Sequence, residues 1–119
     1  MKLFKNITEN KIILYYSNKE LEVDKYFYSI SHIHIVYNSY EGDNSATIIF
    51  LKTNRRYRNK GLATKLLKES IKILKELKIK KIELDDMSDN ARTKNNIYKK
   101  FGFKYINPYP EPEMIYILK

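Results

Sequence analysis

Apolar residues follow two different repeats along the chain, and the repeat changes near the middle. Up to Leu51 the apolar positions form short runs rich in β-branched and aromatic residues, some alternating with polar ones, which predicts strands. From Leu62 to Leu77 the apolar residues recur every three or four positions, with Lys and Glu between them. This spacing predicts a helix of about 17 residues with one apolar face.

The rest of the pattern predicts further strands and one short helix. The expected strands are Leu3–Thr8, Lys11–Ser17, the β-rich run Tyr26–Tyr37 with its clearest alternation from Ser31, Ala46–Leu51, Ile79–Met87, Phe103–Ile106 and Met114–Leu118. Ala46–Leu51 is almost wholly apolar, so we expect it to be buried. The short helix is expected between caps at Ser88–Asn90 and Gly102. This order predicts an α/β fold with a mixed sheet (α+β), in which antiparallel N-terminal strands join a β-α-β-α-β-β C-terminal half.

Length and composition narrow the class of protein. The 119 residues are enough for one domain, taken as residues 1–119. There is no cysteine, so a thiolate metal site or nucleophile is excluded. No apolar run approaches the roughly 20 residues that span a bilayer, and the first residues lack the apolar segment of a secretory signal. We therefore expect a cytoplasmic protein with no membrane partner.

The formal net charge of +9 raises the question of a nucleic-acid partner. Lys, Asn, Ile and Tyr are all abundant while Gly and Pro are scarce, which is the bias expected of an AT-rich genome. The lysines of the long predicted helix are also dispersed rather than gathered in a stripe. The charge therefore favours a solvated surface over a nucleic-acid site.

The loop before the long helix has the composition of an anion site. It contains four basic residues, which are Arg55, Arg56, Arg58 and Lys60. Gly61 stands where the helix begins, and the free N–H groups of a helix N-terminus attract an anion that a glycine allows to approach closely. Neither GxxxxGK[ST] nor GxGxxG is present. From these residues alone, a glycine that only relieves a tight turn is an equally good interpretation.

Two motifs, taken in order and spacing, resemble those of the GNAT superfamily of acetyltransferases. The first is Arg58-x-x-Gly61-x-Ala63 followed by Leu66-Leu67, which is similar to the family's acyl-CoA loop. The second is Ile97-Tyr98-x-Lys100-x-Gly102-Phe103, which is similar to its second signature. Gly61 and Tyr98 are 37 positions apart, which suits one helix, one strand and one short helix between them.

The resemblance implies an N-acetyltransferase that uses acetyl-CoA as co-substrate. A primary amine, whose identity the sequence does not reveal, would attack the thioester directly, without an acyl-enzyme. The cofactor-binding residues that the family pattern implies are Leu51, Lys52, Thr53, Arg58, Asn59, Lys60, Gly61, Leu62, Ala63, Thr64 and Asn90. The strand ending near Thr53 would bind the pantetheine arm of the cofactor. This strand would diverge from the strand at Lys81–Asp85. The backbone amides of the loop at Asn59–Thr64 would hold the pyrophosphate. Asn90 stands one place from the family's usual Asn, at Ala91.

Tyr98 matches the tyrosine that serves as general acid in many members of the family. The pKa of a free phenol is about 10 and that of an alkyl thiol about 8.5, so a neutral phenol can donate a proton to the departing thiolate. Tyrosine is common in this chain, and a Tyr98 that only packs in the core is the other interpretation.

A general base is less evident. Ala46–Thr53 contains no carboxylate, which leaves His32 and His34 on one strand and Glu83 and Asp85 on another as candidates. A metal site at the two histidines would need further ligands that the sequence does not supply, so no metal is expected.

The acceptor side differs from the family pattern. The family usually has two helices between its first two strands, and here only Asn18–Lys25 could replace them. The acceptor side would then be open or completed by a second subunit of a homodimer, with Pro108–Glu113 as one wall. This shortening also allows a second function, a GNAT-fold binding or interaction module without catalysis. A basic nucleic-acid-associated protein ranks third.

Overall fold

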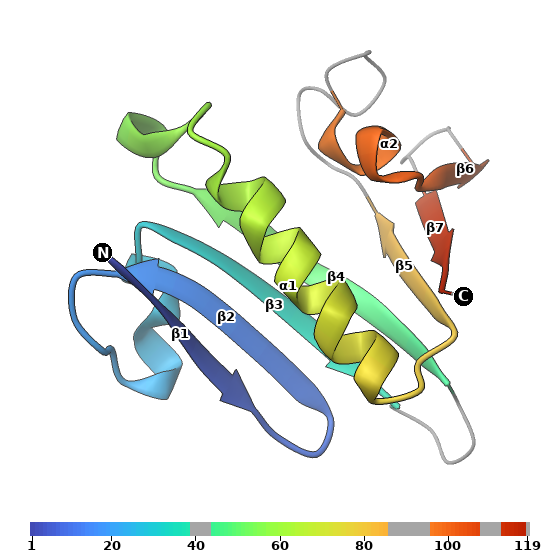
Figure 1. Cartoon of the computed structure of the whole chain (residues 1–119), viewed down its shortest axis with the longest axis horizontal. Helices are drawn as coiled ribbons and strands as arrows, with labels where there is room; N and C mark the ends of the chain where they lie inside the picture. The colour runs from blue at the N-terminus through green and yellow to red at the C-terminus, as the bar shows by residue number, and fades with distance from the viewer. Residues whose placement is uncertain (39–43, 86–95, 108–112, 119) are drawn as a thin grey trace.

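The computed structural model describes residues 1–38, 44–85, 96–107 and 113–118, which contain one seven-stranded sheet with helices against it (Figure 1). The elements in chain order are β1 (Lys2–Ile7), β2 (Lys11–Ser17), η1 (Val23–Tyr28), β3 (Ser31–Tyr37), β4 (Ser45–Thr53), η2 (Arg55–Tyr57), α1 (Leu62–Glu76), β5 (Lys81–Asp85), α2 (Ile97–Phe101), β6 (Lys104–Asn107) and β7 (Glu113–Ile117). The sheet order is β1-β2-β3-β4-β5-β7-β6. Only β4 and β5 pair in parallel within these ranges. The predicted mixed α/β architecture is confirmed.

The N-terminal half is an antiparallel series of four strands that α1 crosses on one face (Figure 1). Alternate residues of β2 and β3 turn toward the helix and are fully buried, for example Leu14 and Ile33, which are register partners. The helix contributes Leu66, Leu67 and Leu74, all fully buried. A period of two on the strands and of 3.6 on the helix thus builds one apolar layer.

Helix α1 begins where the apolar stripe predicts and ends slightly earlier. Gly61 is its N-cap, and the helix runs through Glu76. Leu77, included in the predicted stripe, is the C-cap residue and is partly exposed. Lys78 follows with a positive φ of 64°, so the chain leaves the helical path at this point.

The prediction that Ala46–Leu51 is buried throughout is wrong for its second half. Ile48 pairs with Ile35 and Phe50 pairs with His34, which leaves Ile49 as an extra residue in a β-bulge. The bulge breaks the alternation, and both Ile49 and Phe50 are about half exposed. A continuous apolar run therefore does not establish that both faces of a strand are covered.

Two predictions in the N-terminal half are corrected by η1. The strand expected from Tyr26 begins only at Ser31, because the preceding residues form the 3-10 helix Val23–Tyr28. The short helix expected within Asn18–Lys25, in place of the family's two helices, is this 3-10 helix, and it lies later in the chain than predicted. Tyr26 packs edge-on against His32 at a ring distance of 5.1 Å, so η1 covers the sheet face opposite α1.

The C-terminal half is built around β5 and β7. β5 pairs with β7, and β6 is the edge strand. Helix α2 has Asn96 as N-cap and ends at Gly102, whose φ of 105° confirms the predicted glycine terminator. The cap predicted at Ser88–Asn90 and most of the proline loop, residues 108–112, lie outside the described residues.

Candidate active site

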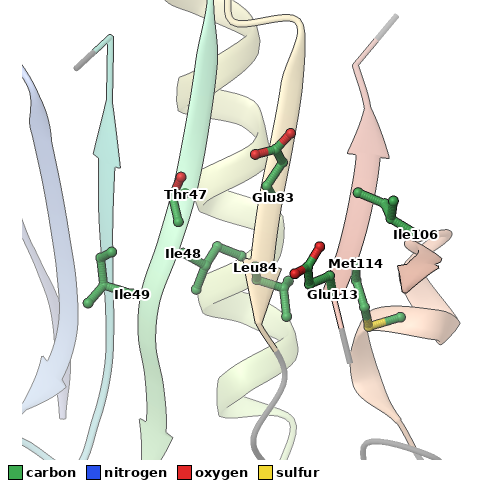
Figure 2. A pocket seen from close by; sticks show the side chains of 8 residues that line it. All are labelled: Thr47, Ile48, Ile49, Glu83, Leu84, Ile106, Glu113 and Met114. Carbon is green, nitrogen blue, oxygen red and sulfur yellow. The ribbon is translucent and has the colours of Figure 1, made fainter. Parts of the chain in front are cut away.

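Strands β4 and β5 part shortly after they meet. Their register contains three pairs in the described residues, ending with Thr47 and Glu83, although β4 continues to Thr53 and β5 to Asp85. A cavity of about 520 Å³ opens where they part (Figure 2). The expected divergence of these two strands is therefore present.

Residues from both faces of the sheet line this one cavity. Ile48, Leu84 and Met114 belong to the core face that the helices cover, because all three are buried in the core cluster. Thr47, Glu83 and Glu113 alternate with them along the strands and so belong to the opposite face (Figure 2). The core-face residues contribute little surface to the cavity, because Ile48 is 6%, Leu84 3% and Met114 0% exposed.

Two bulges complete the lining. Ile49 is the unpaired residue of the bulge in β4, and Ile106 is the unpaired residue where β6 changes register between Tyr105 and Asn107. A bulge redirects a side chain that regular pairing would place elsewhere. Both displaced isoleucines line the cavity, which gives it aliphatic walls.

Beyond Thr47, the edge of β4 that faces away from β3 has no strand partner in the described residues. Asn54 donates its N–H to the Ile30 carbonyl at 2.7 Å, and the Ser31 hydroxyl donates to the Lys52 carbonyl at 3.2 Å. Both bonds lead to the β3 side. Because successive residues direct their backbone groups to opposite sides, Leu51 and Thr53 direct theirs to the open side. Of the three strand residues expected to bind a cofactor arm, these two have the suitable orientation.

The loop before α1 leads into a helix start whose first amides have no intrahelical partner. Gly61 adopts the left-handed conformation with φ 79°, and Asn59 does the same with φ 63°. The helix has no side-chain cap and no acidic residue in its first turn, so the first amides, including those of Leu62, Ala63 and Thr64, lack an intrahelical partner. A Cβ at Gly61 would meet no atom within 4 Å. The glycine is therefore required by its backbone angle, and the space beside it is open.

The basic side chains of this loop are exposed but not all equally free. The Arg58 Nε donates to the Thr53 carbonyl at 3.3 Å, which ties the loop to the end of β4. The Lys60 ammonium lies 5.7 Å from the centre of the Tyr57 ring. Within the described part of the chain, no ion pair involves any of the four basic residues of the loop. Their charge is available to an anion.

Tyr98 lies on the first turn of α2 and is buried on the core face. Its ring packs edge-on against Phe103 at 5.5 Å, and its backbone N–H donates to the Asn96 side-chain oxygen at 2.8 Å. The Asn96 amide also donates to the Met114 sulfur at 3.8 Å, and Met114 lines the cavity. Tyr98 itself does not line the cavity. It is connected to the lining residue Met114 through Asn96.

The two histidines lie one strand away from the cavity. His34 Nδ1 is 2.8 Å from the Tyr26 hydroxyl, and its Nε2 is buried without a hydrogen-bond partner among the described residues. Burial, reinforced by Lys52 and by His34, lowers the pKa of His32 to about 4. Burial, followed by the charge of Lys11, also lowers the pKa of His34. Neither histidine lines the cavity, and no group of three potential metal ligands occurs in the described ranges.

Sequence reasoning found part of this site and missed part of it. Glu83 was one of four candidate bases, and the structure places it at the cavity; Asn90 lies outside the described residues. Thr47, Ile106 and Met114 were not anticipated, and Glu113 was anticipated only as the end of a loop. No local signal identifies them, since their importance comes from register between distant segments.

Comparison with known proteins supports the motif interpretation. The sequence model of the acetyltransferase (GNAT) family matches residues 27–103. No curated protein matches the chain in sequence. None of the described helices combines the length and apolar character needed to cross a bilayer.

Several solved structures share the fold. A GNAT-family acetyltransferase from Staphylococcus aureus aligns with a TM-score of 0.67 at 19% identity, covering 92% of this chain and 68% of that one. The PaiA N-acetyltransferase of Thermoplasma acidophilum, in complex with coenzyme A, gives 0.68 at 22% identity, covering 91% and 61%. YhbS of Escherichia coli, an N-acetyltransferase in complex with CoA, gives 0.64 at 17%, covering 91% and 59%. The chain thus spans about three fifths to two thirds of these proteins.

Proposed function

The chain belongs to the acetyltransferase (GNAT) family, and we propose that it transfers the acetyl group of acetyl-CoA to a primary amine. The observation that carries this proposal is the parting of β4 and β5 beside a cavity that residues of both strands line. A thioester placed in such an opening is accessible to an amine from the face opposite the one that the helices cover. Coenzyme A in two related structures agrees with this choice of co-substrate.

The cofactor would lie on the side of the sheet that carries both helices. Its diphosphate would accept hydrogen bonds from the amides at the start of α1, around Gly61, where the helix dipole and the exposed basic side chains favour an anion. Its pantetheine arm would pair with the open edge of β4 at Leu51 and at the N–H of Thr53, since the Thr53 carbonyl already accepts from Arg58. The Arg58 bond to the Thr53 carbonyl keeps these two binding elements at a fixed separation.

The acid and the base would act from opposite faces. Tyr98 belongs to the core face with the helices, whereas Glu83 belongs to the face beyond the sheet. In the proposed reaction the amine nitrogen bonds to the acetyl carbonyl carbon, and the C–S bond then breaks. The amine's proton passes to Glu83, and the departing thiolate takes the phenolic proton of Tyr98. We favour Glu83 over His32 and His34 because only Glu83 lines the cavity.

The direct test is calorimetry with acetyl-CoA, followed by a thiol-release assay with a panel of primary amines. We expect saturable binding and acetyl-CoA-dependent release of free CoA with at least one amine. An absence of binding at millimolar acetyl-CoA would exclude the proposal. Binding without turnover for any amine or protein acceptor would instead identify a GNAT-fold module that has lost catalysis.

A further inference from the structure

The cavity between β4, β5 and β7 has aliphatic walls and an acidic opening. Five of its lining residues are aliphatic or thioether side chains, namely Ile48, Ile49, Leu84, Ile106 and Met114. Ile49 and Ile106, which are 43% and 55% exposed, supply most of the apolar surface, because the other three are buried. The volume of about 520 Å³ lies within the range of small-molecule sites and suits a short flexible molecule. The walls therefore match a chain of methylene groups better than a strongly polar ring.

The charge of the cavity opposes that of the protein as a whole. The chain has 23 Lys and Arg against 14 Asp and Glu, yet the described residues that line the cavity include Glu83 and Glu113 and no basic side chain. Glu113 is the cross-strand partner of Asp85, and Glu83 stands two residues earlier on β5. The two glutamates thus lie diagonally on one face of adjacent strands, and Figure 2 shows both directed into the opening.

One of these carboxylates already has a cation beside it. The Lys81 ammonium lies 3.3 Å from Glu83, and both side chains are more than 40% exposed. Ion pairs this exposed contribute little to stability, so a substrate ammonium can replace Lys81 at low cost. In the described residues Glu113 has no ion pair. Two carboxylates are therefore available to two positive groups of a ligand.

We infer that the acceptor is a linear aliphatic diamine or polyamine, with its reacting nitrogen near Glu83 and a second ammonium held by Glu113. The inference rests on the proposed function, since it names the amine that the same site would acetylate. An anionic acceptor would meet two carboxylates at the opening. An aminosugar would need partners for several hydroxyls, and the only other polar side chain of the described lining is Thr47.

The test compares a monoamine with a diamine of the same carbon chain, and with a longer polyamine, in the thiol-release assay. We expect kcat/KM for 1,4-diaminobutane and for spermidine to exceed that for butylamine by about tenfold, because only the first two offer a second ammonium. Glu113→Gln should remove about tenfold of this preference by raising KM for the diamines. Glu20→Gln, at an exposed acidic residue outside the site, is the matched control and should leave the preference unchanged.

The outcomes separate this inference from the proposed function. Equal kcat/KM for butylamine and the diamines, or a preference that survives Glu113→Gln, would overturn the inference while leaving acetyl transfer intact. If no amine supports turnover, spermidine binding to the CoA-loaded protein is measured by calorimetry instead. Binding that Glu113→Gln weakens would support the inference although the proposed activity had failed, and no spermidine binding would overturn it.

Discussion

Strand β4 has two edges, and the protein uses them differently. Along one edge it forms seven register pairs with β3, whereas along the other it forms three with β5 in the described residues. The edge paired with β3 belongs to the part of the sheet that α1 covers. The edge that β5 leaves unpaired borders the cavity. From this contrast we expect the N-terminal strands with α1 to contribute most of the stability, and the proposed chemistry to depend on the seam between the halves.

The largest expected effect is at the seam. Tyr98→Phe should bind acetyl-CoA with unchanged affinity yet lose about 10²- to 10⁴-fold in kcat, because only the proton donor is removed. Calorimetry and steady-state kinetics measure the two quantities, and thermal unfolding checks that the fold is retained. Tyr28→Phe, at a tyrosine 73% exposed on η1, is the control. Unchanged kcat would remove Tyr98 from the chemistry.

The next effect tests the paired side. Leu66→Ala should lower the free energy of unfolding by about 2–5 kcal/mol, since Leu66 is fully buried between α1 and the strands. Ile117→Ala, at a residue 58% exposed on β7, should change it by less than about 0.5 kcal/mol. Urea unfolding measures both. Similar losses in the two variants would contradict the division between a stabilising half and a functional seam.

A pH effect of intermediate size is expected from the face that η1 covers. The folded pKa of His32, about 4, is below its unfolded value of about 6.5, so the folded state favours the neutral ring. This contribution is complete above pH 6.5 and is lost as the pH falls from 6.5 toward 4, by up to about 3 kcal/mol. His34, whose pKa is also lowered, acts in the same direction.

Urea unfolding between pH 7.5 and 4.5 measures this dependence. His32→Gln should flatten it in part, leaving the contribution of His34. A stability that stays constant from pH 7.5 to 5 would show that the folded protein protonates these rings as readily as the unfolded chain does, and would contradict the lowered pKa values.

The smallest expected effect on stability is at Gly61, the residue that joins the basic loop to α1. Gly61→Ala should cost about 1–2 kcal/mol of stability, because φ is 79° and no steric clash adds to the cost. Gly61→Asn should cost less, since Asn tolerates this conformation. If a diphosphate occupies the open space beside Gly61, both variants should weaken acetyl-CoA binding. Full affinity in Gly61→Asn would mean that the glycine serves only the turn.

Much of the architecture could be predicted because its signals are local. The spacing of apolar residues from Leu62 located α1 to within two residues, and Gly61 and Gly102 marked a helix start and a helix end. The motifs around Arg58 and Tyr98 indicated the family that the family comparison then established. Each of these features depends on residues a few positions apart, whose conformations are set largely by their own side chains.

The sequence by itself therefore determined most of the elements, their order and the family of this protein. Only the tertiary structure decided where β4 and β5 part, that Ile49 and Ile106 become bulge residues, and that Glu83 and Glu113 come to share one cavity. The physical reason is that strand register is a choice between whole segments, made by the summed packing of many side chains. No single residue encodes that choice, and a shift of one position would send every side chain to the other face.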